Sequence, residues 1–313
     1  MLIVDTDPGT DDAAAIMTLL ASGTKVDAFV SVYGNVAERR TTANLQRLLD
    51  IVGEHDAARY RGAVGPLLGD PVAAKHIHGE DGMSGAFAQP RTDLPELPEL
   101  PELPRVDYGS LIRSAADPVT IIALGPLTNV GAVLAAAPEL VEKIERIIFM
   151  GGAVLTYGNE TPAASFNAAN DPTAAAFVYD SGVPIVQVGL DVCRPAEIPV
   201  KRLLGFRDST TPAGQLIWTL LNNHFMVQRA GGLTEDSVIR FNDAPCMAFF
   251  LRPELFRTEH LPVVVETEGR YSRGATIADF PGYLKREPNT EVLLGIDVEG
   301  YADLVTELLL TYL

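Results

Sequence analysis

Four aspartates, at positions 5, 7, 11 and 12, lie close together near the start of the chain. Carboxylates at such spacing repel one another, so a fold that keeps them together needs positive charge to balance them. A hard divalent cation such as Ca²⁺ or Mg²⁺ supplies that charge, because carboxylate oxygens are its preferred ligands. The structural alternative is capping of a helix, which requires one or two acids rather than four. The run therefore predicts a site that binds a metal ion or a substrate.

The residues around these acids indicate where the site lies in the fold. Apolar residues 2–4 are typical of a buried strand, and residues 13–17 predict the first turns of a helix. The aspartates would then follow the carboxyl end of a strand. In open α/β sheets that edge is where ligands bind.

The rest of the chain repeats this alternation. Short apolar segments typical of buried strands occur at residues 27–32, 119–124, 147–150, 184–189, 263–265 and 291–296. Helical patterns lie between or after them, at residues 41–52, 129–137, 213–228, 245–251 and 301–310, with another helix beginning at Asp171-Pro172. We therefore expect an α/β fold, with a mostly parallel, open Rossmann-like sheet flanked by helices, in a single domain spanning residues 1–313.

Composition limits the possible partners and compartment. The formal net charge of -17 argues against a nucleic-acid backbone or an anionic membrane as a partner. The two cysteines do not form a disulfide framework. We expect a cytoplasmic protein, because no stretch has the length of a membrane span and the first strand begins without a signal-peptide pattern. A proline at every third position of residues 94–104 predicts an extended, rigid connector, with a recognition motif as the alternative.

Polar residues follow other predicted strands in the same relative place as the aspartates. Gly34-Asn35 follows the second strand, residues 125–129 follow the strand ending at Leu124, and Gly151-Gly152 follows Met150. Loops at one edge of a sheet converge, so we expect these residues to share one pocket with the acids.

Taken together, these motifs resemble those of the inosine-uridine-preferring nucleoside hydrolase family. The matching motifs run in order along almost the whole chain: Asp5 to Asp12, Tyr33-Gly34-Asn35, Ile77 to Gly82, Leu124 to Asn129, Phe149 to Gly152, Gly158-Asn159, Phe166-Asn167 with Asp171-Pro172, Gly189 to Val192, Asp243 at the start of a helix, and Ile296 to Val298. The first motif is highly specific, and the others gain force from their order.

The resemblance implies Ca²⁺-dependent hydrolysis of the N-glycosidic bond of a ribonucleoside, giving ribose and a free base. Asp7, Asp12, Asp243 and the main-chain carbonyl of Thr128 resemble the calcium ligands. They leave coordination positions for a water molecule and for the 2′- and 3′-hydroxyls of the ribose. Asp7 also resembles the general base that takes a proton from the metal-bound water.

The resemblance also assigns contacts with the sugar. Asp11, Asn35, Asn159 and Asn167 resemble the residues that hold its hydroxyls, and Met150 resembles the one beneath the ribose ring. The transition state would be oxocarbenium-like, and a ring of acids stabilises such positive charge. The resemblance therefore implies a small-molecule nucleoside as the substrate. It also implies a homo-oligomer, and the sequence does not decide between a homodimer and a homotetramer.

One departure from the family pattern concerns the leaving base. Many members carry a histidine before the helix-opening aspartate, whereas this chain has Asn242, which donates a hydrogen bond but delivers no proton at neutral pH. His78, which the family match places in the pocket, and His224 are alternative proton donors. Aromatic residues that could stack on the base, or else form core or wall, are Trp218, Phe225, Tyr157 and Tyr33.

A second departure concerns the 5′ end of the ribose. The family usually has a glutamate before Phe-Asn, where this chain has Ser165. Serine is shorter and uncharged, so a hydrolase of 5′-modified nucleosides is one alternative. A nucleoside-binding or regulatory protein with weakened catalysis is another.

A rival interpretation concerns the first residues alone. An Asp-x-Asp after the first strand also opens haloacid-dehalogenase-like phosphatases, in which Asp5 would be the nucleophile. That interpretation explains neither the adjacent Asp11 and Asp12 nor the ordered later motifs.

Overall fold

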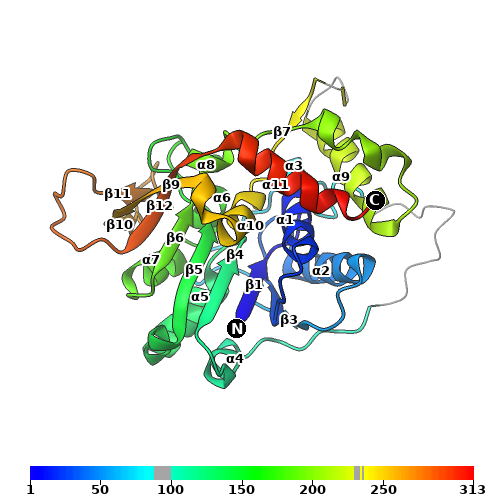
Figure 1. The fold of residues 1–313 in the computed structure, drawn as a ribbon. Helices are drawn as coiled ribbons and strands as arrows, with labels where there is room; N and C mark the ends of the chain where they lie inside the picture. The colour runs from blue at the N-terminus through cyan, green and yellow to red at the C-terminus, as the bar shows by residue number, and fades with distance from the viewer. Residues whose placement is uncertain (88–99, 229–232, 235) are drawn as a thin grey trace.

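The computed structural model describes residues 1–87, 100–228, 233–234 and 236–313. These residues build an eight-stranded sheet in the order β3-β2-β1-β4-β5-β6-β12-β9 (Figure 1). Its strands are β1 (Leu2–Thr6), β2 (Ala28–Ser31), β3 (Ala58–Arg61), β4 (Val119–Ala123), β5 (Ile144–Met150), β6 (Ile185–Val188), β12 (Thr290–Ile296) and β9 (Phe256–Leu261). Neighbouring strands pair in parallel, except that β9 runs antiparallel to β12. The predicted α/β fold with a mostly parallel sheet is confirmed.

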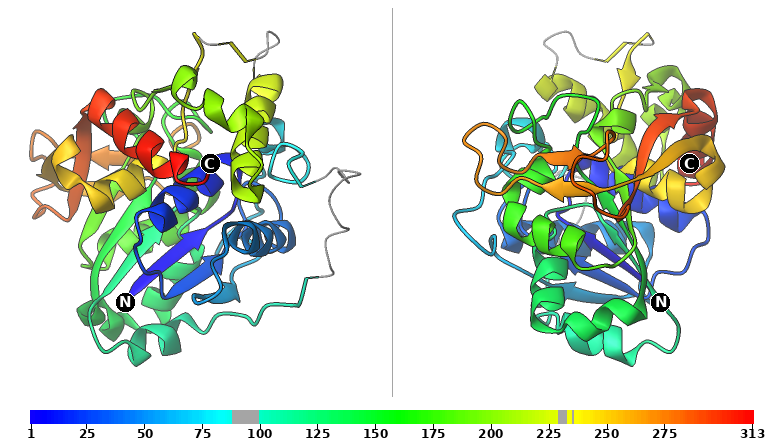
Figure 2. Two further views of the ribbon diagram at one scale, coloured as in Figure 1. Left: turned by 45° about the vertical axis from the view of Figure 1, so that its right-hand side comes forward. Right: turned by 90° about the vertical axis from the view of Figure 1, so that its left-hand side faces the viewer.

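Helices cover both faces of this sheet (Figure 2). They are α1 (Thr10–Ala21), α2 (Glu38–Val52), α3 (Lys75–His78), α4 (Tyr108–Ser114), α5 (Thr128–Ala136), α6 (Phe166–Asn170), α7 (Pro172–Asp180), α8 (Leu190–Cys193), α9 (Pro212–Gln228), α10 (Ala244–Leu251) and α11 (Val298–Leu310). Successive strand residues point to opposite faces, so Val4 joins the core under α1, α2, α9, α10 and α11, whereas Ile3 joins the core under α4, α5 and α7. Strands buried on both faces are continuously apolar, which is why their positions were predictable from the sequence.

The two edge strands, β3 and β9, were not predicted. Their sequences, Ala-Arg-Tyr-Arg and Phe-Arg-Thr-Glu-His-Leu, carry charged residues because an edge strand has fewer buried positions. The predicted helix at 41–52 begins earlier, at Glu38. A small antiparallel pair, β10 (Val263–Val265) with β11 (Thr276–Ala278), lies outside the main sheet.

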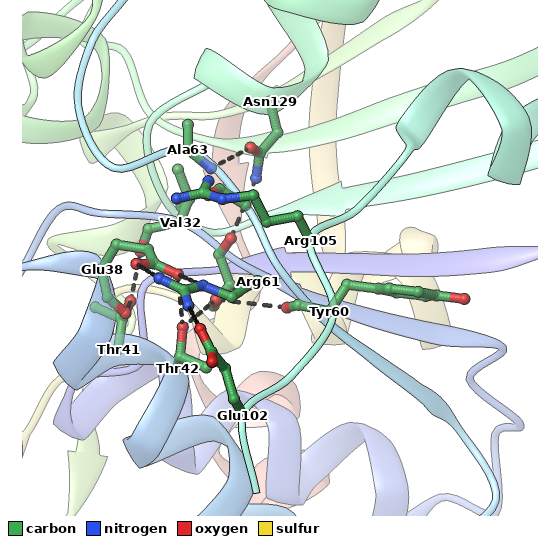
Figure 3. A network of polar contacts seen from close by, with 12 residues as sticks. Val32, Glu38, Thr41, Thr42, Tyr60, Arg61, Ala63, Glu102, Arg105 and Asn129 are labelled. Atoms are coloured by element: carbon green, nitrogen blue, oxygen red, sulfur yellow. Dashed lines mark hydrogen bonds and ion pairs between the residues drawn. The ribbon is translucent and has the colours of Figure 1, made fainter.

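An ion-pair network holds the β3 edge in place (Figure 3). The buried Glu38 at the start of α2 accepts two hydrogen bonds of 3.0 Å from the guanidinium of Arg61, and Glu102 pairs with the same guanidinium. The backbone N–H of Arg61 donates to the carbonyl of Pro104. A buried carboxylate needs such a counter-charge, so this network serves the fold. Residues 94–99 of the proline repeat lie outside the described residues.

Within the described parts of the chain, no helix combines the length and the apolar character needed to cross a membrane.

Candidate active site

The parallel strands bring the residues that follow them to one edge of the sheet, where they surround a cavity of about 110 Å³. Its lining residues are Asp7, Asp11, Asn35, Ala74, Ile77, His78, Leu124, Met150, Asn159, Glu160, Ser165, Phe166, Asn167, Asn242 and Asp243. Of the twelve residues predicted as metal ligands, catalytic residues or substrate contacts, Asp12 and Thr128 are the two that do not line it.

Asp12 is fully buried, next to the cavity-lining residues Asp11 and Asp243. Its Oδ1 accepts a hydrogen bond of 2.6 Å from the Thr6 hydroxyl, and its Oδ2 accepts one of 2.9 Å from the backbone N–H of Gly9. The side chain of Asn35 also donates to Oδ2, over 3.2 Å. These bonds fix the carboxylate at the first turn of α1, where the helix dipole favours negative charge.

Asp7 is fixed from the neighbouring loop. Its Oδ2 accepts a 2.7 Å hydrogen bond from the backbone N–H of Asn35, and its own carbonyl accepts a 3.0 Å bond from the Asn35 side chain. The carboxylate lies between two glycines, Gly34 and Gly125, at each of which a β-carbon would come within 2.6 Å of it. Asn35 therefore orients both Asp7 and Asp12, in addition to lining the cavity.

Three acids come close enough to share one cation. Asp11, Asp12 and Asp243 each offer an oxygen, and these atoms lie within 4.8 Å of one another. Asp11 Oδ1 is buried and has no hydrogen-bond partner among the described residues, and His78 Nδ1 lies 3.9 Å from it. The structure thus groups Asp11 with Asp12 and Asp243, whereas the sequence placed Asp7 in that group. The arrangement could hold a metal ion.

Burial and mutual repulsion make these acids costly in their charged form. Burial raises the pKa of Asp7 and of Asp243 well above the usual range, and neighbouring aspartates raise it further. The pKa of Asp12 is raised to about 6, first by burial and then by the charge of Asp11. A bound cation would offset both effects, because it interacts favourably with the ionised acids.

Four further residues predicted to contact the sugar, Met150, Asn159, Ser165 and Asn167, also line the cavity. The Asn167 amide donates to the carbonyls of Met150, over 2.9 Å, and of Leu124. The Ser165 hydroxyl accepts a 2.6 Å hydrogen bond from the backbone N–H of Gly152, and it is almost completely buried. Asn159 Oδ1 accepts a 2.8 Å bond from the backbone N–H of Phe166.

Thr128 lies away from the cavity. It is the first residue of α5, so helical geometry directs its carbonyl along the helix. Its hydroxyl donates to Asp171 over 2.7 Å. In the same segment, Leu124 lines the cavity instead.

Asp5 also lies away from the cavity. Its Oδ2 accepts 2.9 Å hydrogen bonds from the Tyr108 hydroxyl and the Asn129 amide. A carboxylate sequestered in this way has no access to a substrate, which argues against the phosphatase interpretation.

Two residues considered for assisting the leaving base, His78 as a proton donor and Asn242 as a hydrogen-bond donor, line the cavity. His78 is buried, with Nδ1 3.2 Å from the Thr10 hydroxyl, and Asn242 lies beside Asp243. Glu160 also lines the cavity and was missed, although its position directly after Asn159 was a usable signal.

None of the aromatic residues considered above for stacking on the base, as far as their side chains are described, lines the cavity. Tyr33 is buried, Trp218 packs against the core, and Tyr157 is 69% exposed. The side chains of His224 and Phe225 lie outside the described parts of the structure.

Comparison with known proteins identifies the family. The model of the inosine-uridine preferring nucleoside hydrolase family matches residues 2–303. The chain belongs to this family. The sequence-based resemblance is thereby confirmed, and the protein is a nucleoside hydrolase.

Relatives of this nucleoside hydrolase match it over nearly their full length. The pyrimidine-specific ribonucleoside hydrolase RihA of Escherichia coli O7:K1 is 38% identical, over 99% of this chain and 98% of that protein. The structure of a plant nucleoside hydrolase is similar with a TM-score of 0.85 at 28% identity, covering 98% of each chain. A purine-preferring ribonucleoside hydrolase from Gardnerella vaginalis gives a TM-score of 0.86 at 25% identity, over 98% of this chain and 97% of that one.

Proposed function

We propose that this nucleoside hydrolase is calcium-dependent and cleaves the N-glycosidic bond of ribonucleosides. The observation that carries the proposal is the group of buried carboxylates at the cavity, in which Asp11 Oδ1 has no hydrogen-bond partner among the described residues. Such a set of oxygens suits a hard cation such as Ca²⁺, because neither cysteine nor histidine belongs to the group.

The proposed ligands are Asp7, Asp12, Asp243 and a main-chain carbonyl. Leu124 replaces Thr128 as the source of that carbonyl, because Leu124 lines the cavity and Thr128 does not. The proximity of Asp11 to Asp12 and Asp243 makes Asp11 the competing fourth carboxylate. When bound, Ca²⁺ would supply the positive charge that balances these acids and would make a nearby water molecule more acidic.

The chain's own residues account for the rest of the reaction. Asp7, which lines the cavity and is held by the backbone N–H of Asn35, takes a proton from the attacking water. The water oxygen bonds to C1′ of the ribose while the C1′–N bond breaks and its electron pair moves to the base. The surrounding acids stabilise the positive charge that develops on the sugar, and Asn159 and Asn167 hold its hydroxyls. The departing base regains a proton with help from His78, while Asn242 donates a hydrogen bond.

Pyrimidine ribonucleosides are the preferred substrates in this proposal. The relative at 38% identity is named as pyrimidine-specific, whereas the purine-preferring relative is 25% identical. A homodimer or homotetramer is the proposed assembly, to be measured by analytical ultracentrifugation.

The test is release of free base by protein stripped of metal and reloaded with Ca²⁺. Uridine, cytidine, inosine and guanosine would be compared, with 2′-deoxyuridine as a substrate that lacks one proposed metal-contacting hydroxyl. We expect calcium-dependent turnover that is faster on uridine than on inosine and at least tenfold weaker on 2′-deoxyuridine. Equal turnover with and without a chelator would overturn the calcium dependence, and absence of turnover on all four ribonucleosides would favour a binding protein.

A further inference from the structure

The short helix α8 and the residue after it contact two loops that both contribute residues to the cavity lining. One loop, residues 153–160, carries Asn159 and Glu160, and the other, residues 240–243, carries Asn242 and Asp243. The Asp191 carboxylate accepts hydrogen bonds of 3.1 and 2.7 Å from the backbone N–H groups of Val154 and Leu155. These bonds anchor the start of the first loop.

Arg194, directly after α8, anchors the middle of the same loop. Its Nη1 donates to the Thr156 hydroxyl and to the Tyr157 carbonyl, each over 2.6 Å, and its Nη2 donates to the Gly158 carbonyl over 3.1 Å. The guanidinium also lies 3.6 Å from the centre of the Tyr157 ring. Three consecutive residues, immediately before Asn159, are therefore attached to one side chain.

The second loop is attached to the same segment of backbone. Cys193 Sγ donates to the carbonyl of Asn242 over 3.2 Å. Arg240 Nε donates to the carbonyl of Arg194 over 2.8 Å. The residues flanking both walls of the cavity thus share one support.

We propose that Arg194 is a positioning residue that holds Asn159 in place for sugar binding relative to the Asn242 loop. It touches no substrate and acts through the loop it anchors. This inference rests on the proposed role of Asn159 in the hydrolase reaction.

Arginine suits this position for a geometric reason. Its planar guanidinium offers several donors in fixed directions and stacks on an aromatic ring at the same time. A lysine keeps the charge and reaches the Tyr157 ring, but its single ammonium group cannot reach acceptors on three successive residues. Arg194→Lys is therefore expected to hold the loop before Asn159 only in part.

The test is a double-mutant cycle on kcat/KM for uridine with calcium-loaded protein. We expect Arg194→Ala to lower kcat/KM about tenfold or more, because the three residues before Asn159 lose hydrogen bonds to a charged group. Arg194→Lys should lie between this variant and wild type. In an Asn159→Ala background, Arg194→Ala should change kcat/KM by less than about threefold, because the group it positions is gone.

Arg202→Ala is the matched control. Arg202 pairs with the exposed Glu299 and Asp303 and does not line the cavity, so its loss should leave kcat/KM within about twofold. If Arg194→Ala fails to fold, Arg194→Lys and Arg194→Gln replace it in the same double-mutant cycle with Asn159→Ala.

The outcomes separate this inference from the proposed function. Unchanged kcat/KM in the Arg194 variants, or an equal loss with and without Asn159, would overturn the positioning role alone. Full activity of Asn159→Ala would instead overturn the proposed sugar contact, and the inference would fall with it.

Discussion

A β-carbon at position 34 would lie 1.9 Å from Asp7 Oδ2, so the carboxylate of Asp7 occupies space that glycine alone leaves free. The same carboxylate is held by the backbone N–H of Asn35, the next residue. The loop after β2 thus sets the position of the proposed general base, which belongs to the loop after β1.

Gly34→Ala is therefore expected to displace Asp7 and to lower kcat on uridine by about a hundredfold, within the contribution typical of a general base. Gly65→Ala is the control, because the nearest atom to a β-carbon there lies 3.8 Å away. Steady-state kinetics on both variants, with Tm to verify folding, tests the relationship. Near-wild-type kcat in Gly34→Ala would show that Asp7 tolerates displacement and would weaken its assignment as base.

Calcium titration of single variants distinguishes the two possible ligand sets. If Asp7, Asp12 and Asp243 bind the ion, isothermal titration should show that Asp7→Asn weakens Ca²⁺ binding at least tenfold and more than Asp11→Asn does. Asp12→Asn should weaken it in either case, because Asp12 belongs to both sets. A larger effect of Asp11→Asn than of Asp7→Asn would assign the ion to the trio of Asp11, Asp12 and Asp243.

The leaving group provides a test of His78. If this residue helps to protonate the base, His78→Gln should slow uridine hydrolysis by about 10²-fold or more, as expected for loss of an acid catalyst. It should slow p-nitrophenyl riboside much less, because p-nitrophenolate leaves without a proton. Asn242→His should raise activity on inosine relative to the activated riboside. Equal losses on uridine and on p-nitrophenyl riboside in His78→Gln would show that His78 supports binding rather than proton transfer.

Selectivity at the 5′ end of the ribose depends on Ser165. Its hydroxyl is already used by the backbone N–H of Gly152, and it carries no charge, so we expect wild-type kcat/KM to be similar for uridine and 5′-deoxyuridine. Ser165→Glu should then favour uridine by about tenfold, since a charged acceptor gains about 1.5–3 kcal/mol from a hydroxyl donor. A strong wild-type preference for uridine would point to Glu160, the cavity-lining carboxylate closest in sequence to Ser165, and Glu160→Gln should then remove that preference.

The raised pKa of Asp12 predicts how the metal-free protein responds to pH. The folded-state pKa is about 6, against the ordinary value of 3.8, so between these values the folded state keeps a proton that the unfolded state has released. The contribution of Asp12 to the free energy of unfolding is therefore complete below pH 3.8 and is lost as pH rises through 6.

Asp12→Asn should consequently gain stability relative to wild type as pH rises, when both proteins are unfolded by urea in the presence of a chelator. Measurements at about pH 4.5 and 7.5 suffice, because they lie near the two ends of the transition. Asp180→Asn, at an exposed ion pair with Arg286, serves as the control and should show no such trend. A constant difference between wild type and Asp12→Asn across this range would contradict the pKa assignment.

The sequence by itself determined the class of fold and the residue types at the active edge. Apolar runs such as residues 119–124 predict strands buried on both faces, and the acids after the first strand predict a cation site at the sheet's carboxyl edge. These features depend on the local pattern of apolar residues and on which residues directly follow each strand, and both can be read from the sequence. Ser165 and Asn242 were identified as departures in the same way.

The tertiary structure decided which atoms of those residues share a space. It placed Leu124 rather than Thr128 at the cavity, grouped Asp11 with Asp12 and Asp243, and added Glu160 to the cavity lining. The direction of a carbonyl or carboxylate depends on backbone dihedral angles and on packing between loops distant in sequence, which no local pattern specifies. The support of both loops by α8 and Arg194 also depends on tertiary structure. Arg194 and Thr156 are 38 residues apart in the sequence, and Cys193 and Asn242 are 49 residues apart.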